Sequence, residues 1–160
     1  MALTRRASAE VLYVLRGQGL SEGFGEAISW VTGDALCFPG GDQTIHSATD
    51  DTVLFCVCNE PLLTFEDLEP PRGGHIQVLP THWRKSEMDV RFEKIFKRPD
   101  SEQASGRALQ LATESMAPTR QPIPSMNVAI NTLEPGKDQR PTAITVLRLR
   151  SRSKEQELIR

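Results

Sequence analysis

The sequence lacks both a long apolar run and a strong excess of charge of one sign. No stretch of its 160 residues approaches the roughly 20 consecutive apolar residues that a membrane-spanning helix needs. Its first ten residues, MALTRRASAE, contain no apolar segment of the kind found in secretory signals. The formal net charge of -2 gives no large field that would attract nucleic acid or an anionic membrane. We therefore expect a cytoplasmic protein with no nucleic-acid or membrane partner.

Cysteine is also scarce, and its spacing favours neither a disulfide framework nor a metal knuckle. The chain has three cysteines, an odd number, and two of them alternate within one apolar run: Cys37, Cys56 and Cys58. We expect all three to be reduced thiols in the core.

Short apolar runs that end at glycine or proline dominate the first part of the chain. They cover residues 11–15, 27–31, 35–38 and 52–57. Such short runs, punctuated by turn residues, are typical of an antiparallel sandwich or barrel. Weaker patterns predict further strands at residues 75–79, 90–96, 125–133 and 142–149. The expected fold class is therefore all-β.

Composition divides the chain into three parts. Residues 69–74, EPPRGG, interrupt any periodic element, and residues 99–124 are rich in Ser, Gln, Pro and Arg. We expect a barrel-like unit over 1–69, a connector with irregular structure over 70–124, and strands over 125–160 that pack on the first unit.

Two spaced patterns near the N-terminus resemble the conserved motifs of the cupin superfamily. Glu10, the strand VLYVL and Gly17 resemble the end of the first motif, G-x5-H-x-H-x3-4-E-x6-G. The stretch GDALCFPGGDQTIH resembles the second motif, G-x5-P-x-G-x2-H-x3-N, with His46 arriving two residues late and Asp50 in the place of asparagine. The resemblance implies a double-stranded β-helix, which is a jelly-roll barrel, either complete or incomplete.

The resemblance also implies a metal site inside that barrel, with His46 and Glu10 as ligands. In this family an H-x-H pair, a glutamate and a further histidine form an open coordination shell for Fe(II) or another divalent metal. Counted back from Glu10, the H-x-H positions fall on residues that are not metal ligands: Leu3 and Arg5, or Thr4 and Arg6. Fe(II), another divalent metal and no metal therefore all stay open. So do plainer roles, a solvated loop histidine for His46 and a salt-bridge carboxylate for Glu10.

A second partial motif appears late in the chain. Residues 131–141, NTLEPGKDQRP, resemble the approach to another first motif, with Thr142 and Ile144 at its histidine positions. This order is similar to that of two-cupin proteins of the gentisate 1,2-dioxygenase type. It implies an Fe(II) enzyme that cleaves a hydroxylated aromatic acid, its small-molecule substrate, and a homo-oligomer. The alternatives are a non-catalytic cupin module for binding or oligomerisation, and a fragment of a two-cupin enzyme.

A few other residues have both a functional and a structural interpretation. His75 and His82 are not at a known ligand spacing, and Asp34 is placed to close a turn. Tyr13 is a candidate for lining a pocket. Three arginines could orient a carboxylate substrate or lie on a solvated edge: Arg5, Arg6 and Arg16.

Overall fold

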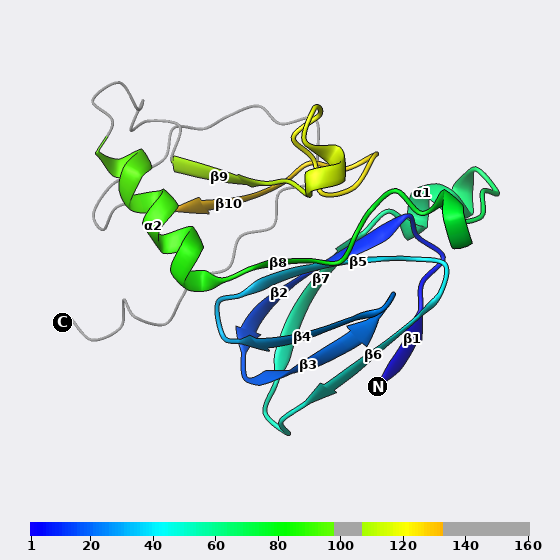
Figure 1. Cartoon of the computed structure of the whole chain (residues 1–160), viewed down its shortest axis with the longest axis horizontal. Helices are drawn as coiled ribbons and strands as arrows, with labels where there is room; N and C mark the ends of the chain where they lie inside the picture. Colours follow the sequence, from blue (N-terminus) through cyan, green and yellow to red (C-terminus); the bar gives the residue numbers. More distant parts are fainter. Residues whose placement is uncertain (98–106, 133–160) are drawn as a thin grey trace.

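Strands predominate over helices in the computed structural model, which describes residues 1–97 and 107–132 (Figure 1). Two antiparallel sheets of four strands each face one another, and a two-stranded sheet forms a third layer. The prediction of a mainly β fold is confirmed. Within the described ranges no strand pairing joins the two four-stranded sheets into a closed barrel, so the cupin jelly roll stays a prediction.

Each four-stranded sheet combines strands that are distant in the sequence. The first sheet has the order β1 (Ala2–Thr4), β6 (Gln43–Ala48), β3 (Gln18–Gly23) and β4 (Glu26–Val31). The second has the order β7 (Val53–Cys58), β2 (Ala9–Arg16), β5 (Ala35–Pro39) and β8 (Thr81–Trp83). The third layer pairs β9 (Arg107–Leu111) with β10 (Val128–Thr132).

Among residues 1–97 and 107–132, helical structure comprises α1 (Glu60–Phe65), α2 (Lys85–Phe96) and the 3-10 turns Gly73–His75 and Glu114–Met116. In the described part of the chain, no helix has both the length and the apolar character needed to cross a membrane.

β2 is buried on both faces because it belongs to the middle layer. Leu12 and Val14 point between the two four-stranded sheets, where they pack with Trp30 of β4 and Phe38 of β5. Neighbouring residues of β2, such as Val11, point the other way and join a second cluster beneath the third layer. This alternation follows from the two-residue period of a strand. It explains why the run VLYVL is apolar without interruption.

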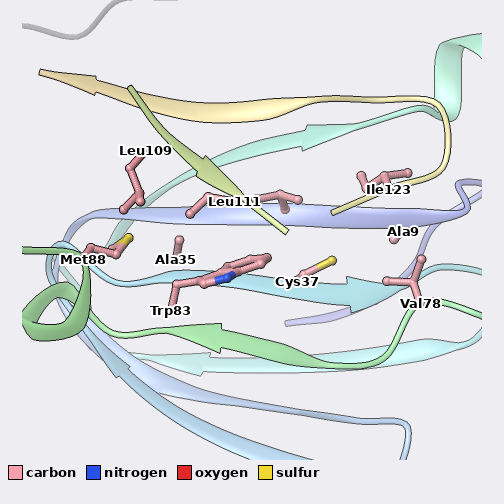
Figure 2. Packing of buried hydrophobic residues seen from close by; sticks show 10 residues of the cluster. Ala9, Ala35, Cys37, Val78, Trp83, Met88, Leu109, Leu111 and Ile123 are labelled. Carbon is pink, nitrogen blue, oxygen red and sulfur yellow. The ribbon is translucent and has the colours of Figure 1, made fainter. Parts of the chain in front are cut away.

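Figure 2 shows the outer cluster between the second sheet and the third layer. The indole of Trp83 lies below Leu111 of β9, and Ile123 lies further along the same face. Met88 of α2 closes one end of the cluster, and Val78 closes the other. The third layer therefore completes a core that the two four-stranded sheets do not make alone.

Gly33 forms the tight turn from β4 to β5. Its φ of 92° is in the left-handed region, which disfavours residues with a side chain. A Cβ at this position would also lie 2.6 Å from Cδ of Lys85. The glycine thus lets the turn approach the start of α2, and this approach positions Asp34, discussed below.

The predicted strand over residues 90–96 is wrong, because these residues belong to α2. The sequence KSEMDVRFEKIF contains neither glycine nor proline and has many good helix formers. Met88, Phe92 and Ile95 recur at helical spacing and pack against the outer cluster. The predicted strand over 75–79 is wrong as well, since β8 begins only at Thr81.

The range 70–124, predicted as an irregular connector, is more regular than expected. Its described part contains β8, α2 and β9, which add one strand to the second sheet and supply half of the third layer. Of the predicted strands over 125–160, β10 is described, and its Val128 and Ile130 pack against the outer cluster. The predicted strand over 142–149 lies outside the described residues.

Candidate functional site

The structure brings the two predicted ligand residues together between the four-stranded sheets. Glu10 lies on β2 and His46 on β6, and both point into the interior, where they are almost fully buried. Nε2 of His46 is 3.5 Å from Oε1 of Glu10. His75 and His82 do not join them: the first lies in an exposed 3-10 turn, and the second contacts Asp34.

Arg5 provides the positive charge that faces Glu10. It lies between β1 and β2, and its Nε donates a hydrogen bond to Oε2 of Glu10 at 3.0 Å. Its Nη1 is 3.9 Å from a carboxylate oxygen of Glu60, at the start of α1. The thiol of Cys56 on β7 also lies within hydrogen-bonding distance of Oε2, at 3.6 Å. Oε2 of Glu10 is thus engaged from two sides.

These contacts keep Glu10 ionised despite its burial. Burial by itself would raise the pKa of a carboxyl group, because it disfavours the charged form. The His46 ring and the Arg5 guanidinium oppose this effect, and the pKa of Glu10 is lower than its ordinary value. The same burial, with the Glu10 charge nearby, raises the pKa of the Cys56 thiol to about 12. Cys56 is therefore a protonated thiol at neutral pH.

Ser21 and Trp30 extend the polar cluster across the first sheet. Nε1 of Trp30 donates to Oγ of Ser21 at 2.8 Å, and the same oxygen lies 2.8 Å from Nδ1 of His46. Because the indole can only donate, the Ser21 hydroxyl is free to donate to Nδ1. We assign the imidazole proton to Nε2 on this basis, which directs it toward Glu10. At 3.5 Å that contact is long, and His46 Nε2 has no hydrogen-bond partner among the described residues.

The cluster resembles a catalytic constellation in composition but differs in access. A serine, a histidine and a glutamate lie in a row, as in hydrolases that use a serine nucleophile. However, Ser21 is 0% exposed and already accepts the indole hydrogen bond. No substrate can reach a nucleophile that is sealed in this way. These residues therefore form contacts within the interior of the fold.

The donor set does not fit the metal site that the cupin resemblance implies. In the described ranges, no group of three or more His, Cys, Asp and Glu side chains is arranged to hold a metal ion. Glu10 and His46 offer only two donors, and the Arg5 guanidinium lies at the carboxylate where a cation would bind. The ligand roles of Glu10 and His46 stay a prediction that this geometry does not favour.

A second polar cluster surrounds Asp34. Oδ2 accepts a hydrogen bond from the backbone N–H of Val31 at 3.1 Å, so the prediction that Asp34 closes a turn is confirmed. Oδ1 accepts from the backbone of Lys85 at 2.8 Å, and Nε2 of His82 lies 2.9 Å from Oδ2. Burial raises the pKa of this carboxyl, but the hydrogen bonds together lower it by more than burial raises it. The pKa of Asp34 is therefore below its ordinary value. Asp34 therefore joins the β4–β5 turn, β8 and the first turn of α2.

Replacing Asp34 with alanine should lower the free energy of unfolding by about 2 kcal/mol, because it leaves backbone donors of two elements without their acceptor. Urea denaturation followed by circular dichroism measures the change. Asp51→Ala is the control, since Asp51 is exposed and pairs with Arg16 at the surface; its effect should stay within about 0.5 kcal/mol. An equal effect of the two substitutions would contradict the linking role of Asp34.

An open pocket of about 930 Å³ lies next to Asp34, between the first sheet and the start of α2. Apolar residues, hydroxyl groups and charged side chains all contribute to its wall. Neither Glu10 nor His46 belongs to its lining. Trp30 is among the lining residues, but it is only 2% exposed, and its indole Nε1 donates to Ser21 in the buried cluster.

The remaining predicted residues lie apart from both clusters. Arg16 pairs with Asp51 and Arg6 with Asp67, in exposed positions. Tyr13 packs against the outer cluster and is not part of the pocket lining. The sequence reasoning missed Ser21, which lies in the polar strand QGLSEG. No hydrophobic pattern marks that strand, so only its antiparallel register, Ser21 opposite His46, reveals the role.

Comparison with known proteins does not identify a family for this chain. No protein-family model matches the chain, and no curated protein and no solved structure is significantly similar to it.

Proposed function

We propose that this chain is a cupin-like binding module that holds a small organic acid in the open pocket and does not use a metal ion. One observation carries the proposal: the pocket excludes Glu10 and His46, which are buried and already engaged with Arg5 and Ser21. The two facing antiparallel sheets and the proximity of the two motif residues support the cupin-like part.

The dioxygenase alternative requires a different arrangement of the same residues. Ring cleavage at Fe(II) needs several protein ligands and open metal positions that face the substrate. Here neither candidate ligand lines the pocket, and a guanidinium contacts the carboxylate. A binding role needs neither ligand and depends only on the pocket.

The lining of the pocket suits a small molecule that has an apolar body and an acidic group. Apolar contacts are available from Leu20, Val31 and Ala48. Hydroxyl groups surround them on Ser29, Thr32, Ser47, Thr49 and Ser86. Arg84 and Lys85 stand at the N-terminal end of α2, where the helix dipole also favours an anion. Both cations have acidic partners one turn along, Glu87 and Asp89, so we expect modest affinity.

Measuring the binding of hydroxybenzoates tests this proposal directly. Ligand-observed NMR should detect gentisate or 4-hydroxybenzoate with a Kd of about 1 mM and weaker binding of the matching neutral amide. Ala48→Trp places a large side chain at the pocket wall and should abolish the signal. Ile45→Trp is the matched control, because Ile45 is on the same strand, is exposed and lies outside the lining.

Three results would contradict the proposal. Binding that survives Ala48→Trp would place the ligand elsewhere, and no binding of any hydroxybenzoate to folded protein would remove the ligand class. Fe(II)-dependent oxygen uptake with gentisate would restore the dioxygenase alternative. Light scattering of the same sample separates a binding module from one that only forms oligomers.

A further inference from the structure

We propose that the Arg5 guanidinium supplies the fixed positive charge beside the buried Glu10 carboxylate. It thereby replaces, electrostatically, the metal ion that the cupin resemblance implies. Glu10 is 1% exposed, and a buried carboxylate is costly unless a positive charge compensates it. Arg5 supplies that charge through its 3.0 Å contact with Oε2. This inference is independent of the pocket and of any ligand bound there.

Position in the sequence supports the replacement. In one of the two possible alignments with the first cupin motif, Arg5 falls on a histidine position of H-x-H. In the fold Arg5, in the segment before β2, contacts the glutamate of that motif on β2. The same residue position therefore serves the same carboxylate, but it offers a fixed cation where a histidine would offer a metal ligand.

The contacts of Arg5 are those of a charge that joins several elements. Besides Glu10 on β2, its Nη2 lies 3.7 Å from Sγ of Cys56 on β7, and its Nη1 lies 3.9 Å from Glu60 at the start of α1. The side chain is 30% exposed, so its head is held between the interior and the surface. One guanidinium thus connects the segment before β2 to β7 and α1, as a coordinated ion would connect its ligands.

The same geometry excludes a second cation at the carboxylate. A divalent ion bound to Oε2 would lie within a few ångströms of the guanidinium, where like charges repel strongly in a buried site. Oε2 also faces the Cys56 thiol, and Oε1 faces the His46 ring. We therefore expect the folded protein to be independent of metal ions and insensitive to chelators.

Thermal unfolding of Arg5 variants tests the role of the guanidinium. Arg5→Ala should lower the Tm by about 5 °C, because it leaves a buried carboxylate without its cation. Arg5→Lys keeps the charge but loses the planar fork of donors, so its Tm should lie between those of Arg5→Ala and the unsubstituted protein. Arg16→Ala is the matched control: Arg16 is 60% exposed and pairs with Asp51 at the surface. Its Tm should change by about 1 °C or less.

Metal titration of Arg5→His tests whether the position is that of a cation site. The substitution removes the fixed charge and adds an imidazole beside Glu10 and His46. With Zn²⁺ or Co²⁺ the variant should bind about one equivalent, gain Tm and, for Co²⁺, show the visible absorption of a coordinated ion. The unsubstituted protein should show none of these responses with or without EDTA.

Opposite results would overturn the inference. They are an Arg5→Ala variant as stable as the Arg16→Ala control, or a folded Arg5→His variant that binds no metal. A third is metal binding by the unsubstituted protein that disappears in Glu10→Gln. Each measurement is made without a pocket ligand, so its outcome is separate from that of the binding proposal.

Discussion

Glu10→Gln should lower the free energy of unfolding at neutral pH by about 2–3 kcal/mol. Removal of one partner from a buried ion pair usually costs about 3–5 kcal/mol, and the partial exposure of Arg5 reduces that figure. The glutamine keeps the shape of the side chain, so the loss reports the missing charge and not a cavity. Chemical denaturation with urea gives the value.

The pH dependence of this effect follows from the pKa of Glu10. Since that pKa is lower in the folded protein than the ordinary value of 4.5, the ionised carboxylate stabilises the fold at all pH values above 4.5. This contribution is lost as the pH falls through the folded-state pKa. The acid limb of the stability curve should therefore be shallower in Glu10→Gln, although Asp34, whose pKa is also lowered, still contributes to it.

Glu22→Gln provides the matched control for this substitution. Glu22 is an exposed residue of β3, and we expect its substitution to change the free energy of unfolding at neutral pH by no more than about 0.5 kcal/mol. Stability of Glu10→Gln equal to that of the control at neutral pH would mean that the Arg5–Glu10 pair contributes nothing. The claim of a buried charge cluster would then be wrong.

Trp30→Ala should have a still larger effect, a loss of about 3–5 kcal/mol. Trp30 is 2% exposed and packs with Leu12, Leu36 and Phe38 between the two sheets. Its removal leaves a large cavity and also takes the donor from Ser21. Urea denaturation can be followed by fluorescence, because Trp83 remains in the outer cluster.

Trp30→Phe separates the two causes of this loss. Phenylalanine fills most of the space but cannot donate to Ser21, so the loss should fall to about 1–2 kcal/mol. The environment of the His46 ring should also change, because the Ser21 hydroxyl contacts both His46 and Trp30. A loss for Trp30→Phe as large as that for Trp30→Ala would contradict a packing role and place the whole effect on the hydrogen bond.

Much of the second sheet is predictable because its strands are apolar on both faces. β2, β5 and β7 coincide with the apolar runs in the sequence. Glu10 and His46, which the sequence analysis names as ligands of one site, lie 3.5 Å apart. Glycine and proline turns fix the length of each strand, and the spacing of residues along the sequence therefore helps to determine which of them meet in the fold. The family itself stays a proposal, since no known protein matches.

The first sheet and the electrostatic partners of Glu10 were much harder to predict. β3 and β6, with the sequences QGLSEG and QTIHSA, are short and polar, and only one residue of β3 and two of β6 are buried. Arg5 precedes β2 in a segment without periodicity, so its contact with Glu10 depends on the path of the chain. The apolar residues within 90–96 are compatible with a strand unless their helical spacing with Met88 is taken into account.

The third layer also affects the folding of this chain during its synthesis. A nascent chain that has emerged only as far as α1 carries β2 and β5, but not the β9 and β10 strands that cover their outer side. Val11 and Cys37 then belong to an apolar surface of the kind that chaperones recognise. Because contacts between distant segments form slowly, we expect this surface to be covered only after synthesis of residues 107–132.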